Sequence, residues 1–159
     1  TNIIPDIVTM GKSMGNGYPI SCCVCSNDIS NTFNKHEYFS SFGGSTLSMC
    51  IGNCVLDIIE YNNLINNVVI ISKYIINKLN ILKYNGQIQQ IFGRGLILGI
   101  EMNNNINVID IVQQLKYNKI LTGSELNILR IKPPIIFTLQ NADQFINTLT
   151  KILQPRVDV

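Results

Sequence analysis

The sequence predicts an α/β chain in two parts: the end of one α/β domain over residues 1–63, and a linking helix with a small α+β domain over residues 64–159. Three observations predict this division. Two β-rich runs enclose a glycine-rich loop near the start of the chain. Long stretches with helical spacing of apolar residues follow, from about residue 45 to residue 82. After Asn85 the pattern changes to short β-rich runs and shorter helices.

The first part is expected to hold two strands and two helices. In order they are strands at 5–10 and 18–26, a short helix at 28–33, and a longer helix from Ser45 or Thr46 to about Tyr61. Phe42-Gly43-Gly44 interrupts the chain before the longer helix. The apolar stripe of that helix is predicted to consist of Leu47, Cys50, Ile51, Cys54, Val55, Ile58 and Ile59.

The second part is expected to pack three helices with short strands. The predicted elements are a helix at 64–82, β-rich runs at 88–92 and 96–101 joined by Gly93-Arg94-Gly95, a helix at 108–117, short strands at 120–121 and 128–131, and a last helix that Thr138 caps. Gly93-Arg94-Gly95 indicates either a hairpin or a kinked strand. Pro133-Pro134 ends the last strand, because proline has no N–H to donate to a sheet.

Composition excludes several classes of protein. The net charge is only +2 and no basic run is present, which argues against a nucleic-acid or polybasic membrane partner. No stretch of about 18 uncharged apolar residues predicts a membrane span. The chain has 28 Ile and 21 Asn but one Ala, which indicates AT-rich codon usage. It begins at Thr1 and reads as mid-protein sequence, so we expect a fragment.

Five cysteines bear on the cellular compartment and on metal binding: Cys22, Cys23, Cys25, Cys50 and Cys54. A zinc site needs paired cysteines or histidine partners, and His36 is the only histidine, so no metal site is predicted. The cysteines are interpreted as small buried apolar residues of a reducing, intracellular compartment.

The loop after the first strand is the first candidate for chemistry. Lys12 follows the strand end and lies between Gly11 and Gly15. A lysine held there can form an imine with a carbonyl cofactor, provided that it is partly desolvated so that a neutral amine is reachable. The alternative is an ordinary solvated loop residue. The spacing does not match the phosphate-binding loop of nucleotide-binding proteins.

Two further places offer anion-binding groups. The run Ser40 to Thr46 is rich in hydroxyls and leads into a helix N-terminus, which suits a phosphate, although plain helix capping by Ser45 or Thr46 explains it as well. Arg130 lies on a short strand before the proline pair and could clamp a carboxylate, although a surface salt bridge is the simpler interpretation.

These pieces occur together and in the same order in one known family. The chain resembles the C-terminal part of class III pyridoxal-phosphate (PLP)-dependent aminotransferases, which have the fold type I architecture. The matching segments are residues 5–19 (PDIVTMGKSMGNGYP), 38–44 (YFSSFGG), 93–101 (GRGLILGIE) and 129–134 (LRIKPP). Within the family it is most similar to the branch of alanine–glyoxylate aminotransferases and of ethanolamine-phosphate or phosphohydroxylysine phospho-lyases.

The resemblance implies a role for each candidate residue. Lys12 matches the lysine that binds the cofactor covalently and then moves the proton at the substrate Cα. Ser41 matches a threonine whose hydroxyl binds the cofactor phosphate of the neighbouring subunit. Arg130 matches the arginine that holds the substrate α-carboxylate. Phospho-lyase relatives often carry lysine at that position, so Arg130 favours an amino-acid substrate. Tyr38-Phe39 and the run 133–138 instead resemble the phospho-lyases.

The expectation is therefore a PLP-dependent aminotransferase acting on an amino acid and a 2-oxo acid such as glyoxylate or pyruvate. The alternatives are a phospho-lyase and a non-catalytic remnant. The resemblance also implies a homodimer or homotetramer with shared active sites, and mitochondrial or cytosolic location. The family's glycine-rich phosphate loop, stacking aromatic and pyridinium-pairing acid are not found in this sequence, so the isolated chain is expected to be inactive.

Overall fold

The computed structural model describes residues 3–154. The chain divides into two compact units, Thr1–Asn62 and Asn63–Val159. Each unit is described separately below. Within residues 3–154 no single helix is long and apolar enough to cross a membrane. The consecutive helices Thr46–Tyr61 and Leu64–Tyr84, which are bent at their junction, reach that length and apolar content only when taken together.

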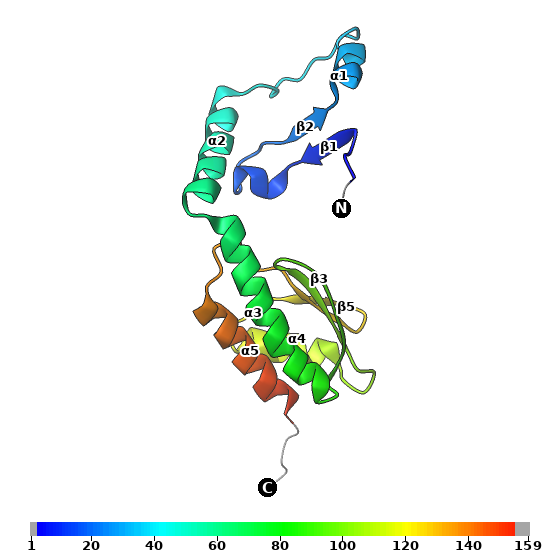
Figure 1. Ribbon diagram of the computed structural model, residues 1–159, viewed down its shortest axis with the longest axis vertical. Coiled ribbons are helices and arrows are strands. Elements are labelled where there is room, and N and C mark those ends of the chain that lie inside the picture. The colour runs from blue at the N-terminus through cyan, green and yellow to red at the C-terminus, as the bar shows by residue number, and fades with distance from the viewer. Residues whose placement is uncertain (1–2, 155–159) are drawn as a thin grey trace. The chain divides into compact units, whose positions relative to one another are not determined.

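The first unit is a small hairpin with two helices (Figure 1). Its elements are β1 (Ile7–Met10), the short 3₁₀ helix η1 (Lys12–Gly15), β2 (Cys22–Cys25), α1 (Asn27–Phe33) and α2 (Thr46–Tyr61). β1 and β2 pair antiparallel, with Ile7 opposite Cys25 and Met10 opposite Cys22. The second strand is shorter than predicted, and part of the predicted loop is the helical turn η1.

Two glycines allow close packing inside the first unit. A Cβ added at Gly15 would lie 2.5 Å from Ile20 Cγ2, and one added at Gly52 would lie 2.8 Å from Ile20 Cδ1. Both distances are shorter than real Cβ contacts, so Ile20 occupies space that only glycine leaves free. Through Ile20, the turn that carries Lys12 is therefore seated on α2.

The inner face of α2 differs from the predicted stripe. Buried or half-buried positions are Ser48, Ile51, Gly52, Val55 and Ile59. Leu47, Cys50, Cys54 and Ile58 are exposed, so the prediction that they face inward is wrong for this part of the chain. The prediction that the cysteines are buried is also wrong here: Cys23 is exposed as well, and Cys22 and Cys25 are half-buried. The two fully buried positions, Ser48 and Gly52, carry small residues, and Ile20 lies against Gly52.

The second unit is a four-stranded antiparallel sheet with helices. Its elements are α3 (Leu64–Tyr84), β3 (Ile88–Arg94), β4 (Ile97–Met102), α4 (Val108–Tyr117), β5 (Gly123–Glu125), β6 (Ile128–Ile131) and α5 (Leu139–Leu153). The strand order is β3-β4-β6-β5. The prediction of a strand at 120–121 is wrong. The edge strand β5 begins at Gly123, because pairing with β6, rather than local apolar content, determines which residues form it.

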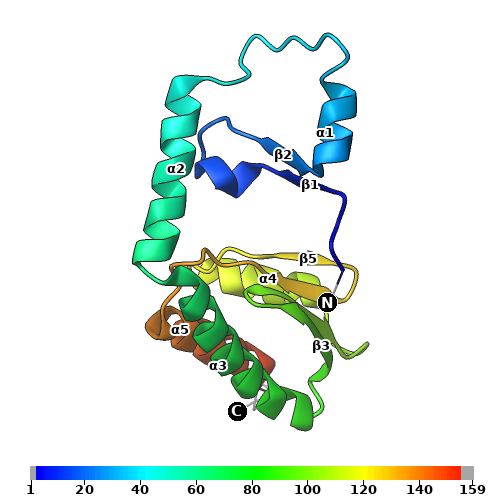
Figure 2. The same cartoon turned by 45° about the horizontal axis from the view of Figure 1, so that its top comes forward.

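The core lies between one face of this sheet and the helices α3, α4 and α5 (Figure 2). Leu98, Ile100 and Met102 alternate along β4 and are buried, and Leu129 and Ile131 of β6 lie beside them in register. The helices contribute Ile71, Ile75, Leu79, Leu115, Ala142, Phe145 and Leu149. The opposite face of the sheet carries more exposed residues, including Phe92 and Arg130.

The connections of the second unit follow the predicted turn chemistry. β3 and β4 form a hairpin with its turn at Gly95 and Leu96, rather than one kinked strand. Gly93 at φ 120° admits no side chain, since a Cβ would lie 2.1 Å from the Ile97 carbonyl oxygen. Thr138 caps α5 in a capping box with Asn141, which confirms that predicted cap. The proline-rich segment before Thr138 is held to α3 by Asn67, whose Nδ2 donates to the carbonyls of Ile135 at 2.8 Å and Phe137 at 3.1 Å.

Candidate functional site

Lys12 begins η1, and only Gly11 separates it from the end of β1. Its φ of 52° is in the left-handed region, which is uncommon for a residue with a side chain and is concentrated at functional positions. The side chain is exposed and lines an open hollow of about 430 Å³ together with Ser13, Asn16, Gly17, Tyr18, Pro19 and Ile20. Residues 3–154 therefore do not supply the desolvation that the imine role requires.

Ser41 lies in the exposed turn that leads to α2. The neighbouring hydroxyls are already used locally: Ser40 Oγ accepts from the Gly43 N–H at 3.0 Å, and Ser45 Oγ caps α2 by accepting from the Ser48 N–H at 3.5 Å. The Ser41 hydroxyl makes no hydrogen bond to another side chain or backbone group within residues 3–154. Of the three serines in this turn, Ser41 is thus the one whose hydroxyl is not used locally. The structure confirms capping by Ser45, and anion binding by the segment stays a prediction.

Arg130 belongs to the second unit, whereas Lys12 and Ser41 belong to the first. It lies in β6 between Gly99 of β4 and Gly123 of β5, each directly opposite it in the register. Its NH1 is 3.8 Å from Glu125 Oε2, and its side chain is 45% exposed. The Thr122 hydroxyl donates to the Arg130 carbonyl. A pairing this long between exposed groups is weak and leaves the guanidinium donors largely available.

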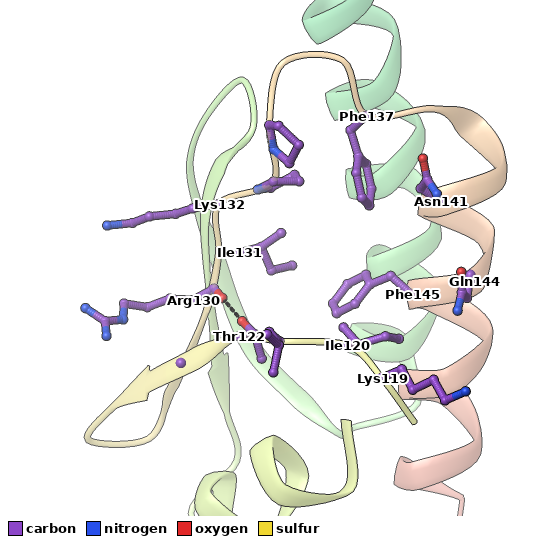
Figure 3. Close-up of a pocket in the computed structure, with 14 residues that line it drawn as sticks. Lys119, Ile120, Thr122, Arg130, Ile131, Lys132, Phe137, Asn141, Gln144 and Phe145 are labelled. Atoms are coloured by element: carbon purple, nitrogen blue, oxygen red, sulfur yellow. Dashed lines mark hydrogen bonds between the residues drawn. The ribbon is translucent and has the colours of Figure 1, made fainter. Parts of the chain in front are cut away.

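A cavity of about 550 Å³ lies beside β6 (Figure 3). Ile131, Phe137 and Phe145 point into it, and Lys119, Asn141 and Gln144 stand at its polar rim. The side chains of Arg130 and Lys132 point to the other side of the strand (Figure 3). Arg130 therefore lines this cavity without directing its guanidinium into it.

Sequence reasoning missed three aspects of these sites. The helical turn and left-handed backbone at Lys12 have no marker beyond the surrounding glycines. The two glycines beside Arg130 are brought there by the register of three strands, which the linear sequence does not specify. The link from Asn67 to Ile135 and Phe137 joins residues about 70 positions apart.

Comparison with known proteins identifies the family. The profile of the family "Aminotransferase class-III" matches residues 1–153, and the chain belongs to this family. The chain is 34% identical to alanine–glyoxylate aminotransferase 2 homolog 2, mitochondrial, of Arabidopsis thaliana, over 93% of this chain and 34% of that protein. It is 32% identical to an ornithine aminotransferase of Oceanobacillus iheyensis, over 96% of this chain and 38% of the relative.

A solved structure gives the same result. A phospholyase from Arthrobacter, in complex with phosphoethanolamine, superposes with a TM-score of 0.89 at 29% identity, over 96% of this chain and 39% of that one. The fold is thus that of fold type I PLP-dependent enzymes, as predicted. The chain spans little more than a third of the length of the relatives that it matches.

Class III aminotransferases depend on PLP. The groups present here fit part of that cofactor: Lys12 supplies the primary amine that its aldehyde needs, and Ser41, in the turn that precedes the N-terminus of α2, supplies a hydroxyl for its phosphate.

Proposed function

We propose that the protein containing this chain is a PLP-dependent aminotransferase that transfers an amino group from an amino acid to a 2-oxo acid such as glyoxylate or pyruvate. The observation that carries the proposal is the family match along 1–153, with an exposed lysine in a left-handed turn at the position expected to bind the cofactor. Because the chain spans little more than a third of its relatives, the activity is proposed for the longer protein.

Lys12 holds the cofactor and moves the proton in this proposal. When bound, PLP supplies an electron-withdrawing ring that stabilises negative charge at the substrate Cα. Once a substrate amine had taken its place on the cofactor, the amine of Lys12 would accept the proton from the substrate Cα and return it to the cofactor carbon on the other side of the substrate nitrogen. The turn η1, seated on α2 through Ile20, fixes where that amine can reach.

Ser41 binds the cofactor phosphate in the proposal, through the hydroxyl that makes no bond within its own turn. The resemblance assigns this contact to the cofactor of a neighbouring subunit, so we propose a homodimer, or a homotetramer built from such dimers, in which each subunit completes the site of the other. Arg130 holds the α-carboxylate of the substrate with its guanidinium donors.

Trapping of PLP tests the role of Lys12. The protein translated from the complete reading frame is incubated with PLP, reduced with borohydride and digested, and the peptide that carries the added mass is identified. We expect the label on Lys12, and Lys12→Ala to lose both the label and the yellow colour. Lys35→Ala, an exposed lysine of the same unit, serves as the matched control and should keep both. A label that persists in Lys12→Ala contradicts the assignment.

A phospho-lyase is the second candidate, because the Arthrobacter neighbour is a phospholyase solved with phosphoethanolamine and Lys132 follows Arg130 on the same side of β6. The two reactions leave different products. Incubation with phosphoethanolamine should release no phosphate if the protein is an aminotransferase, and incubation with an amino acid and glyoxylate should produce glycine. Release of phosphate without consumption of a 2-oxo acid would decide for the phospho-lyase.

We further propose an intracellular location, in mitochondria or the cytosol: the name of the Arabidopsis relative places that protein in mitochondria, and bacterial relatives match as well. The five cysteines carry no disulfide, which fits a reducing compartment. Fusion of the complete protein to a fluorescent reporter would distinguish mitochondria from cytosol. A protein that fails to capture PLP at all would instead support the non-catalytic remnant.

A further inference from the structure

Arg130 is part of a row of four residues that crosses the whole sheet of the second unit. Phe92 of β3 lies opposite Gly99 of β4, Gly99 opposite Arg130 of β6, and Arg130 opposite Gly123 of β5. Residues directly opposite each other in antiparallel strands project from the same face. The face opposite the helices therefore presents two side chains and two glycines in one line, which we call the Arg130 row.

The two glycines of the row make room for different neighbours. A Cβ added at Gly99 would lie 2.5 Å from Cε2 and Cζ of Phe92, so the aromatic ring fills the space above Gly99. A Cβ added at Gly123 would lie 3.1 Å from NH2 of Arg130, so the guanidinium extends over Gly123. The ring occupies the β4 side of Arg130, and the β5 side is left to the guanidinium.

The guanidinium consequently extends toward the edge of the sheet. β5 is the outer strand beside β6, and Glu125, two residues after Gly123, places Oε2 3.8 Å from NH1. The side chain remains 45% exposed. The row thus holds the guanidinium on the glycine surface of β5, with Glu125 at one end and solvent-accessible donors remaining.

We infer that Gly123 is a positioning residue for Arg130: its missing side chain lets the guanidinium lie over the outer strand and present its donors to a carboxylate that reaches the sheet from the β5 edge. Glycine is needed at position 123 for the space that it leaves and not for its backbone conformation, because Gly123 has no left-handed φ, unlike Gly93 and Gly95. The inference rests on the proposed function, since it names how the proposed carboxylate residue is oriented.

Gly123→Ala in the complete protein loaded with PLP tests this inference. The added methyl meets only the far end of a flexible side chain, so the strand should fold normally, and the thermal stability should be equal or slightly higher because alanine restricts the unfolded chain. We expect KM for L-alanine and for glyoxylate to rise by about threefold to tenfold, the loss expected for a weakened charge-assisted hydrogen bond, with kcat nearly unchanged. Gly123→Val should raise KM further.

A double-mutant cycle with Arg130→Lys shows whether Gly123 acts through the guanidinium. Lysine has no planar group to lie over β5, so Gly123→Ala should leave KM unchanged in that background. An unchanged KM in the single variant, or an equal rise in both backgrounds, overturns the inference. A wild-type protein that transfers no amino group and binds no 2-oxo acid in calorimetry overturns the proposed function itself, and the carboxylate role with it. If Gly123→Val does not fold, Gly123→Ala alone decides.

Discussion

The two units of the chain differ in how they bury their apolar residues. The second unit encloses a continuous core in which Ile75, Ile100, Leu129 and Leu149 are fully buried. In the described part of the first unit only Gly15, Ser48 and Gly52 are buried, and its strands and helices expose Ile7, Val24, Leu47, Met49, Leu56 and Ile58. Large exposed apolar surfaces of this kind mark interaction sites. The second unit thus has the core of an independent domain, whereas the first requires further protein to cover it.

Separate expression of the two units tests most directly whether only the second unit folds by itself. Residues 63–159 should give a soluble protein with a cooperative thermal transition, because their core is complete. Residues 1–62 should show no cooperative transition and should bind a hydrophobic dye, because little apolar area is removed from water. Circular dichroism melting and dye fluorescence measure both. A sharp, reversible transition for residues 1–62 would contradict the comparison.

A single truncation in the core of the second unit tests whether that core is tightly packed. Leu129→Ala in residues 63–159 should lower the free energy of unfolding by about 2–5 kcal/mol, since it leaves a cavity beneath β6 in a fully buried position. Leu126→Ala, three residues earlier and 89% exposed, is the matched control and should change it by less than about 0.5 kcal/mol. Urea unfolding measures both values. Equal effects would show that the core is not packed as described.

A smaller effect is expected from Gly52→Val in the first unit. The new side chain would collide with Ile20, whose Cδ1 lies 2.8 Å from the Cβ position, and would displace the turn that carries Lys12. Overpacking of this kind costs about 1–3 kcal/mol. In the complete protein, borohydride trapping of PLP on Lys12 should fall severalfold. Asn53→Val, which introduces a valine on the exposed face of α2, should leave the amount of trapped PLP as in the parent protein.

The smallest effect concerns the contact between α3 and α5 at alkaline pH. The Tyr74 hydroxyl donates to Asp143, and this hydrogen bond, followed by burial and the Asp143 charge, raises the pKa of Tyr74 above its ordinary value. A raised pKa favours the neutral phenol in the folded state. Its contribution is therefore present below pH about 10 and is lost as the pH rises through the higher folded pKa.

Tyr74→Phe should accordingly flatten the alkaline decline in the stability of residues 63–159. Lys78 also contacts the Tyr74 ring, with its Nζ 5.4 Å from the ring centroid, so Lys78→Gln is the control that separates this contact from the hydrogen bond to Asp143. Melting temperatures between neutral and alkaline pH measure the effect. A decline in Tyr74→Phe as steep as in the parent would show that the hydrogen bond to Asp143 contributes nothing.

Local patterns predicted the second unit better than the first. The long α3 helix, the hairpin at Gly93, the proline stop after β6 and the Thr138 cap depend on neighbouring residues and were confirmed. The inner face of α2 was predicted only in part: Ile51, Val55 and Ile59 are half-buried, whereas the other four residues of the predicted stripe are exposed. The prediction also missed Ser48 and Gly52, the two fully buried positions, of which Gly52 packs against Ile20. That contact joins residues far apart in the sequence, and no periodicity marks it.

The candidate site likewise combines residues that local motifs predicted with features that only the folded chain reveals. Lys12, Ser41 and Arg130 were selected from motifs, and their roles remain proposals. The structure adds what the motifs lack: which serine hydroxyl of the turn is free, and which glycines flank the guanidinium. Both depend on hydrogen-bond partners and strand register, which arise from the folded chain as a whole.

The backbone at Lys12 has a consequence for how this protein changes over generations. A left-handed φ of 52° is easily adopted by glycine or asparagine and is costly for lysine, so the folded turn alone would favour replacing the lysine. Only a requirement for its amine opposes that replacement. Drift to glycine or asparagine at position 12 would therefore be an early sign that a lineage no longer uses the site, and its retention in close relatives would be a sign of continued selection.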